Sequence, residues 1–158
     1  MFGGVIPFSE MRGQREQLRK EGRRIVATNG CFDILHVGHL RYLAQARALG
    51  DVLWVGLNGD ESVRQLKGNG RPVHGELDRA EVLAALRMVD AVTIFPEKRA
   101  TDFLKELGPE IYAKGGDYTI ASLDVDEREA LTGCGARIEI LPMIPGRSTT
   151  EALRKLGR

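Results

Sequence analysis

The chain has 158 residues, of which 42% are hydrophobic and 28% are charged, as expected for one compact domain with a buried core. Its 23 basic residues nearly balance its 22 acidic residues, and the net charge of +1 argues against nucleic acid or an anionic membrane as the main partner. No apolar run reaches the roughly 18 residues of a membrane span, and the first residues lack the apolar stretch of a signal peptide.

The first predicted element is a helix over residues 9–21. After it, Val- and Ile-rich runs of strand length alternate with amphipathic stretches. The runs show little polar alternation, which is typical of parallel strands covered on both faces. They predict five strands, at residues 24–28, 52–57, 91–95, 110–113 and 137–142. The stretches between them predict helices over 40–49 with Gly50 as C-cap, over 78–90, and over 100–108 with Gly108 and Pro109 as the stop.

This alternation predicts an α/β fold: a Rossmann-like doubly wound sheet of about five parallel strands with helices on both faces. We expect residues 1–158 to form a single domain, with residues 1–22 as an N-terminal helical extension. Ligands of such sheets bind beyond the carboxyl ends of the strands. The loops after the five strands are therefore the segments to search, at residues 29–39, 58–60, 96–99, 114–117 and 142–150.

The loop after the first predicted strand, residues 29–39, reads NGCFDILHVGH. Asn29 and Gly30 are expected to turn the chain, and Asp33 is expected to accept hydrogen bonds from backbone N–H groups. Neither G-x-x-x-x-G-K-[ST] nor G-x-G-x-x-G occurs in the chain, so a phosphate site in this loop must be built in another way.

Two histidines of this loop stand at the expected start of the next helix. His36 and His39 are about one turn apart, so both imidazoles can face the same side, and Gly38 leaves room for a ligand to approach. Unpaired N–H groups at a helix start favour an anion, and the pattern therefore predicts a phosphate site. The alternative is that one imidazole caps the loop while the other packs against the core. Zinc is disfavoured, because His74 is the only further histidine.

The segment TNGCFDILHVGHLRYL resembles the HxGH signature of the nucleotidyltransferase superfamily, whose members couple a nucleotide to a phosphate ester. RSTT, which begins at Arg147, resembles the second signature of that superfamily, with Arg where Ile is common. Taken alone, Ser148 and Glu151 fit a capping box that leaves Thr149 and Thr150 exposed. A capped helix start with extra hydroxyls is also compatible with a phosphate site, so the two interpretations coexist.

A glycine-rich segment, RQLKGNGRPV at residues 64–73, carries two cations. It is predicted to be a loop that offers Lys67 and Arg71 to a phosphate, and a solvated basic turn is the alternative. Arg79, on the predicted helix 78–90, is a candidate phosphate contact, with surface ion pairing as its default role.

A second glycine-rich segment, AKGGDY at residues 113–118, follows the fourth predicted strand. Lys114 can supply a point charge, Gly116 allows a positive φ and close approach, and Asp117 can contact a ribose or sugar. An ordinary turn is the alternative.

Taken together, these segments are similar to the adenylyltransferase domain of bacterial ADP-heptose synthesis in its stand-alone form, over about residues 23 to 156. The resemblance implies transfer of AMP from ATP to D-glycero-D-manno-heptose 1-phosphate, giving pyrophosphate and ADP-heptose for lipopolysaccharide or other surface glycans. It implies ATP as a substrate and Mg²⁺ bridging the phosphates, with no metal-binding residues in the protein. A cytoplasmic enzyme without nucleic-acid or membrane partners is expected, and the resemblance suggests a homodimer.

The resemblance also implies residue roles. His36, His39 and Lys114 are expected to be catalytic. The residues expected to contact the nucleotide are Asn29, Gly30, Cys31, Phe32, Gly38, His39, Gly116, Asp117, Ser148, Thr149 and Thr150. The residues expected to contact the acceptor are Asp33, Lys67, Arg71 and Arg79.

Other functions remain open at this stage. Glycerol-3-phosphate cytidylyltransferases share both main motifs, and FMN adenylyltransferases belong to the same superfamily. A regulatory module that binds nucleotide without turnover is the alternative from another class. The two cysteines, Cys31 and Cys134, lie far apart and predict reduced thiols. A redox role for Cys31 is disfavoured, because no C-x-x-C accompanies it.

Overall fold

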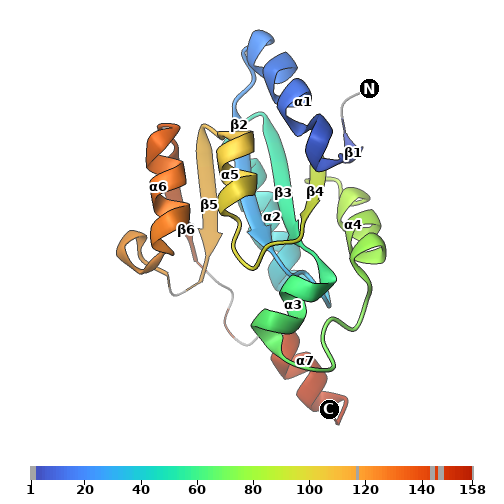
Figure 1. The fold of residues 1–158 in the computed structure, drawn as a ribbon. Helices are drawn as coiled ribbons and strands as arrows, with labels where there is room; N and C mark the ends of the chain where they lie inside the picture. Colours follow the sequence, from blue (N-terminus) through green and yellow to red (C-terminus); the bar gives the residue numbers. More distant parts are fainter. Residues whose placement is uncertain (1–2, 117, 143–144, 146–147, 158) are drawn as a thin grey trace.

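Six parallel strands form one sheet in the computed structural model, which describes residues 3–116, 118–142, 145 and 148–157 (Figure 1). Their order across the sheet is β1-β4-β3-β2-β5-β6. The strands are β1 (Gly4–Val5), β2 (Ile25–Gly30), β3 (Val52–Asn58), β4 (Ala91–Phe95), β5 (Ile111–Gly115) and β6 (Arg137–Leu141). The Rossmann-like α/β prediction is confirmed, with one strand more than expected. That extra strand, β1, pairs with β4 at the sheet edge and has only two residues, too few to give a periodic signal.

The helices lie on both faces of the sheet (Figure 1). They are α1 (Phe8–Lys20), α2 (Val37–Arg47), α3 (Asp60–Lys67), α4 (Glu76–Ala84), α5 (Thr101–Leu107), α6 (Val125–Gly133) and α7 (Thr149–Lys155), with a 3₁₀ turn, η1, at Ile120–Ser122. One core cluster includes Met11 of α1, Phe103 of α5 and Leu131 of α6. A second, on the opposite face, includes Leu43 of α2 and Leu83 of α4. In the described part of the chain no helix is long and apolar enough to cross a membrane.

The central strand β3, VLWVGLN, is buried along its whole length, as the absence of polar alternation predicted. Gly56 in this strand makes room for α5, because an added Cβ would lie 2.7 Å from the ring of Phe103. Across the sheet, the indole N–H of Trp54 donates a hydrogen bond to Thr93 Oγ1 at 3.0 Å. Apolar packing and satisfied polar groups together fix this strand against its neighbours.

Two expectations about turns are wrong in detail, and a third is confirmed. Asn29 and Gly30 do not turn the chain, because β2 continues through both, and the left-handed residue of this loop is Phe32, with φ of 43°. Gly50 is not a C-cap: α2 ends before Ala48, and Gly50 is required because a Cβ there would meet Val26 at 2.6 Å. Gly108 does terminate α5 in the left-handed conformation, as expected, with φ of 53°.

Three boundaries also differ from expectation. The segment 64–73 is not wholly a loop, because α3 extends to Lys67. Helix α4 ends at Ala84 rather than near residue 90. Lys114 lies within β5 rather than after it. Apolar periodicity locates an element, whereas its last turn depends on packing that the sequence does not display.

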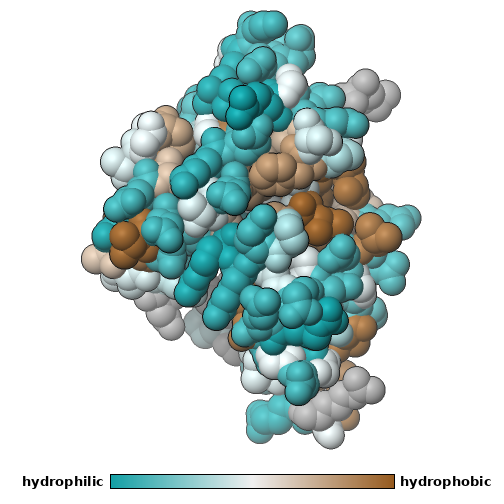
Figure 2. Space-filling view, in the orientation of Figure 1, coloured by the Kyte–Doolittle hydropathy of each residue, from teal (hydrophilic) through white to brown (hydrophobic). Residues whose placement is uncertain are grey.

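Helices α3 and α7 lie beyond the carboxyl ends of the strands, where the loops that carry the motifs also gather (Figure 1). Figure 2 shows that the face of the molecule turned to the viewer in Figure 1 is mostly hydrophilic, with apolar side chains gathered near α4. On that helix Leu77 and Val82 are exposed. The carboxyl edge of the sheet is the region in which the predicted site must be sought, because ligands of such sheets bind there.

Candidate active site

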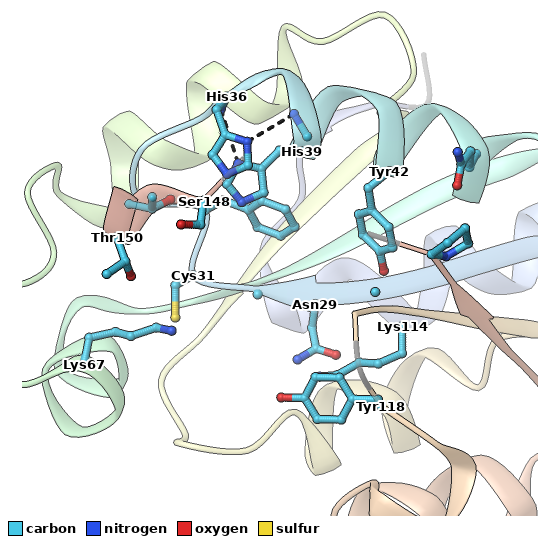
Figure 3. A pocket seen from close by; sticks show the side chains of 17 residues that line it. Asn29, Cys31, His36, His39, Tyr42, Lys67, Lys114, Tyr118, Ser148 and Thr150 are labelled. Carbon is cyan, nitrogen blue, oxygen red and sulfur yellow. Dashed lines mark hydrogen bonds between the residues drawn. The ribbon is translucent and has the colours of Figure 1, made fainter. Parts of the chain in front are cut away.

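A cavity of about 340 Å³ opens at the carboxyl edge of the sheet, and both signature motifs line it (Figure 3). The predicted site residues in its wall are Asn29, Gly30, Cys31, Phe32, His36, Gly38, His39, Lys67, Lys114, Ser148, Thr149 and Thr150. His36 and His39 lie beside Ser148 on one side of the cavity, and Lys114 and Tyr118 lie on the other (Figure 3). The expectation that the histidines and the hydroxyls of residues 148–150 share one cavity is confirmed.

The two histidines form a reciprocal cap at the start of α2. Nδ1 of His36 accepts a hydrogen bond from the N–H of Gly38 at 3.1 Å, and Nδ1 of His39 accepts one from the N–H of His36 at 3.3 Å. Since a backbone N–H can only donate, both imidazoles carry their proton on Nε2 when they are neutral. The capping interpretation and the phosphate-site interpretation are therefore compatible.

His39 is held in its neutral form. Burial lowers its pKa to about 4, and the neighbouring His36 acts in the same direction. The two rings lie 3.9 Å apart between centroids, and the ring of Phe32 meets His39 edge-on at 5.5 Å. At neutral pH, His39 therefore offers an N–H donor rather than a cation.

Asn29 and Tyr42 fix the floor of the cavity. The hydroxyl of Tyr112 donates to Oδ1 of Asn29 at 2.6 Å, which leaves the Asn29 amide nitrogen as a donor. Tyr42 donates to the carbonyl oxygen of Ala113 at 2.9 Å, so the hydroxyl of Thr28 donates to the Tyr42 oxygen at 2.6 Å. Tyr42 thus joins α2 to β2 and β5, and burial raises its pKa to about 12.

The start of α7 brings three hydroxyls to the side of the cavity where the histidines lie (Figure 3). Ser148 is its N-cap, as predicted, and Ser148 Oγ accepts a hydrogen bond from the N–H of Glu151 at 3.1 Å. The Glu151 carboxylate pairs with Lys155 instead of completing the capping box. Thr149 donates to the carbonyl oxygen of Ile34 at 3.0 Å, whereas Thr150 is exposed. Thr150 is therefore the better-placed phosphate donor of the two.

A second cavity of about 320 Å³ adjoins the first and shares ten lining residues with it, among them Cys31, His39 and Thr149. Its wall carries five cations: Lys67, Arg71, Lys98, Arg99 and Lys114. Two carboxylates, Asp33 and Glu127, also line it. Of these five cations the first cavity shares only Lys67 and Lys114, so the second cavity is the more cationic of the two and the better suited to a second phosphate.

Lys114 lies between these cavities at the end of β5. Burial lowers the pKa of its ammonium group below the usual value, while the charge of Glu127 acts in the opposite direction. The ammonium group also lies 4.7 Å from the ring centroid of Tyr118. This position is consistent with the predicted role of Lys114 as a charge beside transferring phosphates.

Asp33 is committed to the protein. Its buried carboxylate accepts hydrogen bonds from the N–H groups of Val73 and His74 at 2.9 and 3.0 Å and pairs with Arg71 Nε at 2.7 Å. Burial raises the pKa of Asp33, but these donors outweigh it and hold the pKa below its usual range. We therefore revise the prediction for Asp33 from an acceptor contact to a residue that positions Arg71.

Arg79 is likewise revised. Its guanidinium is almost fully buried and donates to four protein oxygens at 2.7 to 2.9 Å, rather than forming surface ion pairs or reaching a ligand. The acceptors are the carbonyl oxygens of Cys31, Asn58 and His74 and the carboxylate of Asp60. A phosphate would have to displace these partners, so Arg79 instead holds three loops of the site together.

The remaining predicted residues are placed less centrally. Gly116 has φ of 103°, as its glycine allows, and its N–H donates to the carbonyl oxygen of Leu141 at 3.2 Å. Asp117 and Arg147 lie outside the described residues. Cys31 and Cys134 are free thiols, as predicted, and burial raises the pKa of Cys31 above its usual value. A raised pKa disfavours the thiolate that redox chemistry at Cys31 would need.

Several lining residues were not predicted from the sequence: Tyr42, Gln45, Tyr118 and Pro142 in the first cavity, and Asn58, Leu66, Lys98, Arg99 and Glu127 in the second. The position of Lys98 and Arg99 after β4 was a usable signal, because that loop ends at the same edge of the sheet. Glu127 had no such signal, since it reads as an ordinary residue in an amphipathic helix.

Within the described ranges, no group of three or more His, Cys, Asp or Glu side chains could hold a metal ion. Of the carboxylates in the second cavity, Asp33 is committed to three donors and Glu127 has one oxygen bonded to a backbone N–H. These residues fit a magnesium ion that takes most of its ligands from phosphates and water rather than from the protein.

Comparison with known proteins gives one family. The model of the cytidylyltransferase-like family matches residues 27–153. Bifunctional protein HldE of Citrifermentans bemidjiense is 49% identical over 85% of this chain, and that of Koribacter versatilis is 45% identical over 96% of it. The chain spans less than a third of the length of these curated relatives, at 27% and 31%.

Solved structures show the same fold. The lipopolysaccharide core biosynthesis protein from Thermoplasma volcanium GSS1 superimposes with a TM-score of 0.63 at 30% identity, over 78% of this chain and 98% of that one. Pantoate-beta-alanine ligase from Francisella tularensis superimposes with a TM-score of 0.59 over 94% of this chain and 69% of that one. Its identity of 14% supports a likeness of fold alone.

Proposed function

Because the chain belongs to the cytidylyltransferase-like family, we propose that it is an adenylyltransferase acting on a sugar 1-phosphate. The proposed reaction transfers AMP from ATP to D-glycero-D-manno-heptose 1-phosphate and releases pyrophosphate and ADP-heptose. The observation that carries the proposal is the pairing of a motif-lined cavity, which suits a nucleotide, with a cation-lined cavity beside it, which suits a second phosphate.

The proposed step is an in-line displacement at the α-phosphorus of ATP. An oxygen of the sugar phosphate forms the new bond, and the bond to the bridging oxygen of pyrophosphate breaks. A phosphate monoester has a second pKa of about 6, so the attacking oxygen is mostly ionised at neutral pH and needs no general base. Catalysis then depends on positioning and on stabilising charge.

Different side chains of the first cavity are proposed to position the substrates and to stabilise charge. The Nε2–H donors of His36 and His39 face the transferring phosphoryl group, and the hydroxyls of Ser148 and Thr150 face the leaving phosphates. Lys114, between the two cavities, neutralises charge that both substrates share. When bound, Mg²⁺ would neutralise part of the triphosphate charge. A homodimer and a cytoplasmic location stay predictions.

The second cavity is the proposed acceptor site. Arg71, oriented by Asp33, and Lys67 at the end of α3 supply charges for the acceptor phosphate, together with Lys98 and Arg99 from the loop after β4. Because the two cavities share ten lining residues, an acceptor phosphate in the second would lie beside the triphosphate in the first.

Pyrophosphate release tests the proposal directly. The protein would be assayed with ATP or CTP against heptose 1-phosphate, glycerol 3-phosphate and FMN. We expect turnover with ATP and heptose 1-phosphate. Because the matching family is described as cytidylyltransferase-like, CTP is the main competing nucleotide. Tight nucleotide binding without pyrophosphate from any acceptor would instead indicate a regulatory module.

A further inference from the structure

Glu127, near the start of α6, is a buried carboxylate in the wall of the second cavity. Glu127 is 6% exposed, and it lines the second cavity but not the first. Oε1 accepts a hydrogen bond from the N–H of Ala100 at 2.8 Å. The other oxygen, Oε2, has no hydrogen-bond partner among the residues that the structure describes.

In the described part of the chain, Arg15 Nε is the buried side-chain polar atom without a partner, so Oε2 of Glu127, although its residue is buried, keeps access to the solvent in the cavity. Asp33, the other carboxylate of this cavity, has all of its accepting capacity directed at Arg71 and two backbone N–H groups. In the described part of the chain, Glu127 forms no ion pair within 4 Å. Its charge nevertheless raises the pKa of the nearby Lys114. Glu127 is therefore the carboxylate of the cavity with accepting capacity left for a ligand.

The chemistry of that ligand follows from the wall around it. The five cations favour binding of a phosphate in this cavity, whereas the negative charge of Glu127 would repel a phosphate group placed next to it. The group that meets Glu127 must instead be a hydrogen-bond donor on the same molecule as the phosphate. Sugar hydroxyls are such donors, and a hydroxyl bonded to a carboxylate gives a strong, charge-assisted hydrogen bond.

We propose that Glu127 determines acceptor specificity by accepting a hydrogen bond from a hydroxyl of the sugar phosphate bound in the second cavity. This inference rests on the proposed function, because it assigns the second cavity to the acceptor. Glu127 distinguishes a hydroxylated phosphate ester from a bare phosphate, which the cations alone would bind equally well.

The test compares Glu127→Gln with Glu129→Gln, a matched control on an exposed position of the same helix. Glutamine keeps an oxygen for the N–H of Ala100 but replaces the carboxylate oxygen facing the cavity with an amide NH₂. KM for heptose 1-phosphate, KM for ATP, and Ki for inorganic phosphate competing with the acceptor would be measured, together with the melting temperature.

We expect Glu127→Gln to raise the KM of the sugar phosphate roughly tenfold or more, the loss of one charge-assisted hydrogen bond. KM for ATP, the melting temperature and all parameters of Glu129→Gln should stay unchanged, and Ki for inorganic phosphate should not rise. A sugar-phosphate KM that is unchanged or lower overturns the proposal, since a merely repulsive or structural carboxylate predicts that result. A KM and a phosphate Ki that rise together overturn it as well.

The same measurements separate this inference from the proposed function. If wild-type protein releases no pyrophosphate with any sugar 1-phosphate, the proposed function fails. The Glu127 comparison then uses whichever hydroxylated acceptor the wild-type protein does turn over. If it turns over none, binding of glycerol 3-phosphate and inorganic phosphate is compared by calorimetry. If Glu127→Gln weakens binding of glycerol 3-phosphate but not of inorganic phosphate, the role of Glu127 is supported. If wild-type protein and Glu127→Gln bind glycerol 3-phosphate with equal affinity, it is overturned.

Discussion

The hydroxyl of Thr149 donates a hydrogen bond to the carbonyl oxygen of Ile34 at 3.0 Å, across 115 positions of sequence. This contact ties the start of α7 to the loop that leads into α2. The hydroxyl motif and the histidine motif are thus joined by the protein itself, before any nucleotide bridges them. A hydroxyl used in this way positions the site rather than donating to a phosphate.

Thr149→Val should loosen this connection, because valine keeps the shape of threonine and lacks the hydroxyl. One neutral hydrogen bond contributes about 0.5–1.5 kcal/mol, so KM for ATP should rise by up to roughly tenfold. Thr149→Ser keeps the donor and should retain most of the affinity. Steady-state kinetics of the two variants would check this, and equal effects of valine and serine would contradict it.

His39→Ala should fold normally and lose about a hundredfold or more in kcat, the usual cost of removing one preorganised donor beside a developing charge. His74→Ala is the matched control, because its imidazole lines neither of the two site cavities. Pyrophosphate release and the circular dichroism of both variants provide the measurement. Near-full activity of His39→Ala would remove His39 from the mechanism.

The low pKa of His39 makes stability depend on pH. Its pKa is 6.5 in the unfolded chain and about 4 in the folded protein, so between these values the unfolded chain binds a proton that the folded protein does not. The free energy of unfolding should therefore fall as the pH is lowered through this window and should not depend on His39 above it. Urea titrations at several pH values would measure the free energy of unfolding of wild-type protein and of His39→Gln. Between pH 4 and 6.5, this free energy should depend less steeply on pH in the variant.

Lys114→Met should lower kcat/KM by roughly tenfold to a hundredfold, because it removes a charged donor while keeping the aliphatic stem that packs near Tyr118. Lys105→Met, on the exposed face of α5, is the control for loss of one positive charge. An equal effect of the two substitutions would mean that Lys114 acts only through the overall electrostatic potential of the protein. Steady-state kinetics at low and high salt would distinguish such a long-range effect from a direct contact.

Asp33→Ala should destabilise the protein, because it leaves two backbone N–H groups and Arg71 without their acceptor. The expected cost is roughly 1–3 kcal/mol or more in the free energy of unfolding. The acceptor KM should rise as well, since Arg71 loses its orientation. Glu81→Ala, at an exposed position of α4, should change neither quantity. A fully stable Asp33→Ala protein would contradict the positioning role given to Asp33.

Much of the fold could be read from the sequence. The five Val- and Ile-rich runs are all strands, because a strand buried on both faces leaves a continuous apolar signature. The edge strand β1 leaves none, since two residues show no period. Cap chemistry was equally legible at Gly108 and Ser148, where one residue and its backbone decide the local structure.

The sequence by itself determined which loops carry the chemistry, because parallel strands bring their carboxyl ends to one edge whatever the side chains are. Only the tertiary structure decided which side chains of those loops face the cavity and which are used internally. In sequence, Asp33 and Arg79 are charged loop or helix residues like Lys67 and Arg71. In the structure, the first two are buried in hydrogen bonds to other parts of the protein, whereas Lys67 and Arg71 supply charges to the second cavity. Burial and hydrogen-bond partners depend on contacts between distant segments, and residue type and spacing do not encode them locally.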